Sequence, residues 1–180
     1  MDRFKKSFLS ALGLAIVLVI YGYFLSNFGE DYAADLSFFT DQLQVPFHPV
    51  VVHFPLALFT TALGLEILGW ISRKKFLHQC AVCLYVLAAI VAPLVVRTGL
   101  WEAERLHLGH PLLIQHQTFA LWTMWTALMS LPILWFFYHK FPPIFRVLFV
   151  LCLINSAILV SLTGDRGGRM VYEYDIGVEE

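Results

Sequence analysis

Charged residues are scarce in this chain: they make up 14% of its 180 residues, against about 25% in a typical soluble domain. There are 12 lysines and arginines against 13 acids, so no basic excess is available for a nucleic-acid-binding surface. Apolar side chains, by contrast, reach 59%, with 16 phenylalanines among them. These proportions exclude a soluble enzyme, a disordered chain and a nucleic-acid-binding protein. They indicate a protein embedded in a lipid bilayer.

Cysteine is also sparse, and the cysteines lie in apolar runs, which excludes an extracellular disulfide framework. Cys80 and Cys83 have the spacing of a redox or metal motif. Leu84 follows them, however, where a c-type haem attachment requires histidine. We therefore interpret these cysteines as small side chains within a membrane helix.

Five apolar stretches are long enough to cross a membrane, which takes about 20 residues in a helix. They cover residues 7–28, 50–72, 79–100, 113–138 and 144–164. The first follows a basic start and is longer than a cleaved signal peptide, so we interpret it as a retained signal anchor. The predicted fold class is an all-α integral membrane bundle of five transmembrane helices. Residues 1–46 are expected to form the anchor helix and an outer acidic segment, and residues 47–180 a four-helix domain with an outer tail.

The loop charges predict the orientation, because lysine and arginine concentrate on the cytoplasmic side of a membrane. A cytoplasmic N-terminus places most of the basic residues inside, namely Arg3, Lys5, Lys6, Arg73, Lys74, Lys75, Lys140 and Arg146. The opposite side then receives most of the acids and the histidines His48, His53, His107, His110 and His116. We therefore expect the C-terminus on the outer side of the membrane.

The second and fourth expected helices share a spacing of small and polar side chains. His53 is followed by Ala57, Thr60 and Gly64, and His116 by Ala120, Thr123 and Ala127. Offsets of four, seven and eleven residues place each set on one face of its helix. The third and fifth helices also end alike, in Thr98-Gly99 and Thr163-Gly164. The pattern predicts a duplicated helical hairpin, with both copies in the same orientation.

A histidine at the same depth on each of these faces predicts a cofactor, because ionisable side chains inside a membrane bundle are costly and mark functional sites. We predict haem b ligated by His53 and His116, with His48 as the alternative ligand. The side chains expected to leave room for the macrocycle are Ala57, Thr60, Gly64, Ala120 and Thr123. The guanidinium groups expected beside the haem propionates are those of Arg97, Arg166 and Arg169.

The leading functional hypothesis is a cytochrome b-like electron-transfer subunit, with haem near the outer face and no catalytic residue of its own. Two alternatives stay open. In one, the small side chains serve only helix packing in an accessory or scaffold subunit of a membrane redox complex. In the other, zinc or copper is held by the imidazoles of His48, His53, His110 and His116. The expected partner of a haem carrier is a basic periplasmic redox protein of the cytochrome c type, or a larger membrane redox complex.

Glu66 is an acid inside an expected span. It follows His53 by thirteen residues, which places it about 220° further round the helix and away from the small side chains. Structural pairing with a neighbouring group is the interpretation we favour over a proton relay. On the same inner side, we interpret His78 and His139 as solvated interfacial side chains.

Several motifs resemble the domain-of-unknown-function family 2231. Residues 48–55, HPVVVHFP, with Glu66 later in the same helix, are similar to the opening motif of that family. Residues 97–103, RTGLWEA, followed by His116, are similar to its middle. Residues 167–173, GGRMVYE, with Gly177-Val178, resemble its tail. The resemblance spans about residues 47–178 and leaves the first helix outside.

The resemblance implies a bacterial inner-membrane protein of a family without an established activity. Some relatives are joined to Rieske-type or cytochrome c-type domains, which implies membrane redox work. The family pattern covers His48, His53, His116 and the pair Gly167-Gly168. We expect no such domain in this chain and therefore expect its redox partner to be a separate protein.

Overall fold

The computed structural model describes residues 3–27, 47–105 and 109–176, and within these ranges every regular element is an α-helix. The helices are α1 (Arg3–Asn27), α3 (Phe47–Val51), α4 (His53–Ser72), α5 (Lys75–Arg105), α6 (Pro111–Lys140) and α7 (Pro142–Tyr174). Five spans are long and apolar enough to cross a membrane. The predicted all-α class and its transmembrane helices are thereby confirmed. The expected outer acidic segment, residues 28–46, lies outside the described residues.

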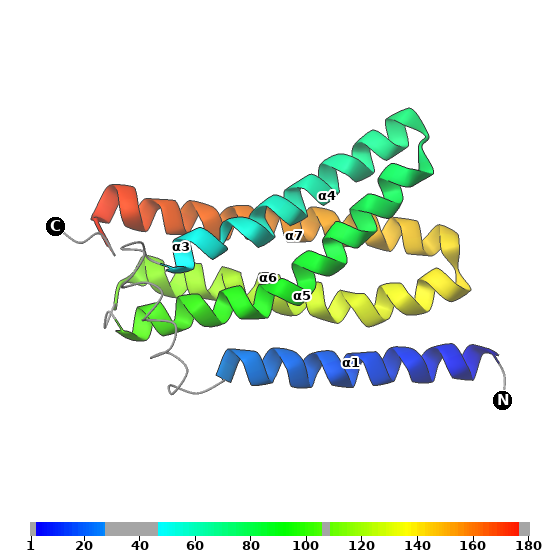
Figure 1. The fold of residues 1–180 in the computed structure, drawn as a ribbon, viewed down its shortest axis with the longest axis horizontal. Helices are drawn as coiled ribbons and strands as arrows, with labels where there is room; N and C mark the ends of the chain where they lie inside the picture. Colours follow the sequence, from blue (N-terminus) through cyan, green and yellow to red (C-terminus); the bar gives the residue numbers. More distant parts are fainter. Residues whose placement is uncertain (1–2, 28–46, 106–108, 177–180) are drawn as a thin grey trace.

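Two antiparallel hairpins build the bundle, α4 with α5 and α6 with α7 (Figure 1). Their short connections force neighbouring helices to run antiparallel. Arg73 ends α4 in the left-handed conformation, with φ of 55°, and Phe141 alone separates α6 from α7. Near the α4–α5 connection the first hairpin diverges from the second. At the opposite end, α3 lies beside the end of α5 (Figure 1).

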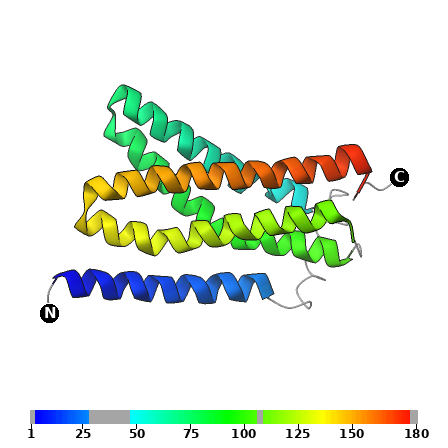
Figure 2. The same ribbon diagram turned by 180° about the vertical axis from the view of Figure 1, so that it is seen from behind.

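The first helix lies along the edge of this four-helix arrangement. α1 packs against α6 and α5, and Figure 2 shows it parallel to the long axis of the bundle. One of its contacts is a hydrogen bond from the Tyr21 hydroxyl to the carbonyl oxygen of Ile90, at 2.8 Å. Most of its apolar side chains are exposed, as expected where lipid is the solvent.

The bundle interior combines small side chains with a few aromatic rings. The alanines without exposed surface are Ala62, Ala81, Ala88, Ala89 and Ala127. Small residues let helix backbones approach closely, which is how membrane helices gain packing energy. Tyr85 packs edge-to-face against Phe59 and Phe149, with ring centroids 5.5 and 5.6 Å apart. Large apolar side chains such as Trp70 and Ile71 point outward instead. Both the interior and the outer surface of the bundle are therefore apolar, as a lipid environment requires.

Candidate functional site

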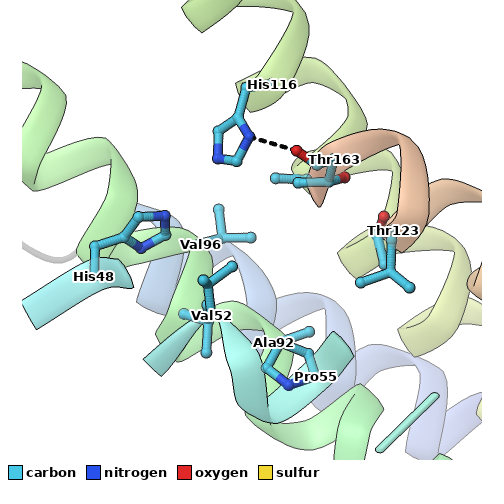
Figure 3. A pocket seen from close by; sticks show the side chains of 11 residues that line it. His48, Val52, Pro55, Ala92, Val96, His116, Thr123 and Thr163 are labelled. Carbon is cyan, nitrogen blue, oxygen red and sulfur yellow. Dashed lines mark hydrogen bonds between the residues drawn. The ribbon is translucent and has the colours of Figure 1, made fainter. Parts of the chain in front are cut away.

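Two histidines from different hairpins meet at the end of the bundle where α3 lies. His48 belongs to α3, and His116 to the second turn of α6. Their ring centroids are 6.1 Å apart, and their ring planes are inclined by 86°. Figure 3 shows the two rings pointing toward one another across a pocket. The arrangement joins the two hairpins through a pair of imidazoles.

The backbone of α7 determines which nitrogen of His116 carries the proton. Nδ1 of His116 lies 2.8 Å from the carbonyl oxygen of Thr163. A carbonyl only accepts, so Nδ1 donates and Nε2 keeps a free lone pair. Gly167 lies against the ring, and a Cβ on this residue would be 3.2 Å from Cε1 of His116. The glycine therefore lets α7 approach the imidazole closely.

The side chain of Thr98 on α5 holds the other ring in a similar way. Nδ1 of His48 lies 3.0 Å from Oγ1 of Thr98, and that hydroxyl donates to the carbonyl oxygen of Val95 at 2.8 Å. Because a hydroxyl has one proton, Oγ1 accepts from His48, and Nε2 of His48 is again unprotonated. A Cβ on Gly99 would lie only 2.6 Å from Cε1 of His48. Position 99 therefore requires glycine, because any side chain there would collide with the His48 ring.

The histidines line an apolar pocket with a volume of about 40 Å³. The lining from the first hairpin and α3 consists of His48, Val52, Pro55, Ala92, Val95 and Val96. The second hairpin supplies His116, Ala120, Thr123, Val160 and Thr163. The hydroxyls of both lining threonines donate to carbonyl oxygens of their own helices. What the pocket offers a ligand is therefore an apolar wall and two imidazole nitrogens.

One residue spacing occurs twice in this lining. His48, Val52 and Pro55 have the same four- and seven-residue spacing as His116, Ala120 and Thr123. The threonines that hold the rings also correspond, Thr98 on α5 with Thr163 on α7. The two hairpins therefore match in a register that pairs His48, and not His53, with His116.

The predicted pairing of His53 with His116 is corrected by this register. The His53 side chain is exposed, and its Nδ1 lies 2.6 Å from the carbonyl oxygen of Pro49. The reason is the helical geometry: Val52 keeps helical dihedrals, its N–H donates to the carbonyl oxygen of His48 at 3.0 Å, and a five-residue offset turns His53 about 140° away from His48. His48 in α3 therefore faces α6, while His53 in the first turn of α4 lies at the surface.

The face of α4 below His53 is also outside the pocket. Ala57 and Thr60 are exposed, and a side chain on Gly64 would meet open space. Their predicted place is taken by Val52 and Pro55. On α6, by contrast, Ala120 and Thr123 line the pocket. Small side chains in the sequence do not identify Val52 and Pro55, because valine and proline stand where α6 has alanine and threonine.

The three arginines predicted beside the site differ in their partners. Arg97 is partly buried and makes no ion pair with another described residue. Arg166 pairs with Asp165, and Arg169 with the exposed Glu173, at 3.0 Å. Arg97 is therefore the arginine among them that keeps its charge available for a ligand.

His110 acts as a helix cap. Its Nδ1 accepts from the backbone N–H of Leu112 at 3.2 Å, and its ring lies 4.9 Å from that of Tyr174. Among the described side chains, no three from histidine, cysteine, aspartate and glutamate gather in a group that could hold a metal ion. The predicted four-histidine zinc or copper site is therefore not assembled in this part of the chain.

A comparison with family models gives a match over residues 44–180, to the family described as "Predicted membrane protein (DUF2231)". The matched range contains α3 and both hairpins, and with them the two facing histidines. The match agrees with the resemblance drawn from the motifs. Comparisons with curated proteins and with solved structures give no match.

Proposed function

This chain belongs to the DUF2231 family of predicted membrane proteins, and from that premise we propose that it is a membrane-embedded haem b protein that carries electrons. His48 and His116 are the residues that would hold the haem iron. One observation carries the proposal: each Nδ1 is held by an oxygen of a threonine, which leaves two unprotonated Nε2 atoms for a metal. Histidines that bind metals are generally held through their other nitrogen in this way.

The distance between the rings supports a metal between them. A linear nitrogen–metal–nitrogen bridge with bonds of about 2 Å sets two imidazole centroids roughly 6 Å apart. The centroids of His48 and His116 are 6.1 Å apart.

The number of protein ligands favours haem over a bare ion. Structural zinc takes about four protein ligands, whereas the described residues offer two imidazoles at this place. A haem brings four nitrogens of its own and needs only axial ligands from the protein. When bound, it would supply one-electron redox chemistry. The apolar lining matches the apolar faces of a macrocycle and excludes water from them.

The pocket must widen to admit a macrocycle, since about 40 Å³ holds only a few water molecules. The element best placed to move is α3. It is five residues long and lies at the end of the bundle, where the hydrogen bond between His48 and Thr98 joins it to α5. Outward movement of α3 would open the pocket while His116 stays fixed on α6. Arg97, next to Thr98, is then the guanidinium available for a propionate.

Absorbance and electron paramagnetic resonance spectra test the proposed function. Protein purified in detergent from haem-replete cells should show a Soret band that sharpens and shifts on reduction. The ferric form should give a low-spin signal, as expected if two imidazoles hold the iron. A protein without a Soret band would contradict the proposal and favour the accessory or scaffold subunit.

We propose a bacterial inner-membrane location with the N-terminus in the cytoplasm and the C-terminus in the periplasm. The exposed basic side chains at the α4–α5 connection support this orientation, since such residues are retained inside. The histidine pocket lies at the opposite end of the bundle and would thus face the periplasm. A basic periplasmic cytochrome c-like protein, or a larger membrane redox complex, is the proposed electron partner, because complementary charge accelerates encounter with the acidic outer residues.

Cysteine labelling tests this orientation. Lys74→Cys, at the α4–α5 connection, should resist a membrane-impermeant maleimide applied to spheroplasts, because we place it in the cytoplasm. Glu173→Cys, exposed near the end of α7, should react readily. The three native cysteines are replaced by serine in the background used for both variants. The opposite labelling pattern would move the histidine pocket to the cytoplasmic face.

A further inference from the structure

The pocket between His48 and His116 has room for one small ligand without any movement of α3. Its volume is about 40 Å³, which a few water molecules would fill. Figure 3 shows a ring nitrogen of each histidine directed toward the other ring across this space. Within the described part of the chain, the hydrogen bonds of both rings engage Nδ1 and leave Nε2 without a partner. Two lone pairs are thus directed into one small cavity.

The spacing of the rings fits a shared metal ion better than a hydrogen bond. For imidazoles that face each other along one line, a direct hydrogen bond between the nitrogens sets the ring centroids roughly 5 Å apart, and a bridging water roughly 7 to 8 Å. One metal ion with two bonds of about 2 Å sets them roughly 6 Å apart. The centroids of these two rings are 6.1 Å apart, which is the spacing for a metal ion.

The number of protein ligands limits which bare ion can bind here. In the part of the chain that the structure describes, no group of three or more histidine, cysteine, aspartate and glutamate side chains could hold a metal ion. Structural zinc takes four ligands, so two imidazoles do not satisfy it. Copper binds imidazole nitrogen well, and copper(I), with its filled d shell, forms linear complexes with two ligands. The facing pair matches this geometry.

The lining of the pocket also favours an ion of low charge. Besides the two histidines, the lining residues are valine, alanine, proline and threonine, and no acid is among them. The free energy of moving an ion from water into such surroundings rises with the square of its charge, so a divalent ion costs about four times as much as a monovalent one. Neutral imidazoles cancel neither charge. A monovalent ion is therefore the better ligand for this pocket.

A second polar pair in the bundle shows the contrast between a histidine with an acid beside it and these two. Glu66 on α4 is 2% exposed, and its Oε2 lies 2.6 Å from Nδ1 of His78 on α5. The pairing predicted for Glu66 is thus present, and the interpretation of His78 as a solvated interfacial side chain is corrected. There the imidazole has a carboxylate partner within the protein. His48 and His116 have no carboxylate in their pocket, so their Nε2 atoms stay available for an external ligand.

We propose that His48 and His116 bind one copper(I) ion between their Nε2 atoms, in a linear site with two ligands. The inference goes beyond the proposed function and does not rest on it, because it concerns the pocket with α3 in contact with α5. The hydroxyl of Thr98 and the carbonyl oxygen of Thr163 hold the two rings through Nδ1 and so fix their orientation toward the ion. A haem would need the same two nitrogens after α3 moves outward, so each ligand excludes the other.

Anaerobic titration with copper(I) tests this site. The full-length protein, purified in detergent without added haem, competes for copper(I) with the coloured chelator bicinchoninate. The three native cysteines are replaced by serine in this parent protein, because thiolates bind copper(I) strongly. The parent should take one equivalent of copper(I) from the chelator. His48→Ala and His116→Ala should each lower the affinity by more than about tenfold, whereas His53→Ala, which changes an exposed histidine, should bind copper(I) as the parent does.

X-ray absorption at the copper edge gives a second measurement that needs no histidine variant. The spectrum of the loaded parent should show two nitrogen neighbours at about 2 Å and the edge feature of copper(I) with two ligands. Three or more neighbours would overturn the proposed site. An excess of zinc(II) should leave the copper in place, and displacement by zinc would overturn the choice of a monovalent ion.

The failure of this inference is distinguishable from the failure of the proposed function. The absence of a Soret band after haem-replete growth contradicts the haem proposal alone. Copper(I) that stays with the chelator overturns the copper site alone, and so does binding that is unchanged in His48→Ala and His116→Ala. One equivalent bound by the parent, lost in both of these variants and kept in His53→Ala, supports the copper site.

Discussion

Replacing either His48 or His116 by alanine is expected to remove the low-spin haem spectrum from this protein. Each change deletes one of the two imidazoles whose rings face each other at 6.1 Å. Loss of a group that merely orients a metal ligand already lowers metal affinity by about 10- to 100-fold, so loss of the ligand itself should exceed tenfold. The measurement is haem content per protein, with the reduced and oxidised absorbance spectra.

His53→Ala is the matched control, because His53 is five residues from His48 and exposed. It should retain haem and spectrum. Added imidazole should restore the low-spin spectrum of His48→Ala, since a free ligand can enter the space that the side chain leaves. Full haem retention in His48→Ala, together with loss of haem in His53→Ala, would contradict ligation by His48 and His116. It would support the pairing of His53 with His116 that the sequence predicts.

Gly99→Ala is expected to reduce haem binding nearly as strongly without touching a ligand. The new Cβ would lie 2.6 Å from Cε1 of His48, a distance that carbon atoms do not tolerate, so the imidazole must move. Overpacking of this kind costs about 1–3 kcal/mol, which corresponds to about 5- to 150-fold in affinity. Titration of the apoprotein with haem measures the change directly.

The control for this change is Gly164→Ala, which occupies the matching position after Thr163 in the second hairpin. A Cβ on Gly164 meets nothing within 4 Å. Both glycines lie inside long helices, so both variants gain the same helix propensity, about 1 kcal/mol. The difference between them isolates the contact with His48. Equal haem affinity in the two variants would show that the ring at Gly99 does not hold the metal.

The sequence by itself determined the membrane class and the helical architecture. Uninterrupted apolar runs of about 20 residues have one outcome in a bilayer, since a helix satisfies every backbone hydrogen bond internally. The spacing His116, Ala120 and Thr123 was also readable, because α6 is continuous through these positions and helical periodicity places them on one face.

Which histidine faces His116 was decided by the tertiary structure alone. His48 and His53 open the same apolar stretch, and in a continuous helix a five-residue offset turns them about 140° apart. Periodicity counted along such a helix can choose either one. The contacts of His48 with Thr98 and Gly99 on α5 select His48, and they join residues about 50 positions apart in the chain.

The partner of Glu66 was likewise set by the turn between α4 and α5. Helical periodicity correctly directs Glu66 away from Thr60, but it is silent about the neighbouring helix. Arg73, in the left-handed conformation, reverses the chain, and the first turn of α5 then brings His78 to within 2.6 Å of the carboxylate. Local sequence determines each helix and its faces, because backbone geometry repeats along it. Which faces pack against one another depends on turns and on contacts between residues far apart in the chain. These contacts exist only in the folded bundle.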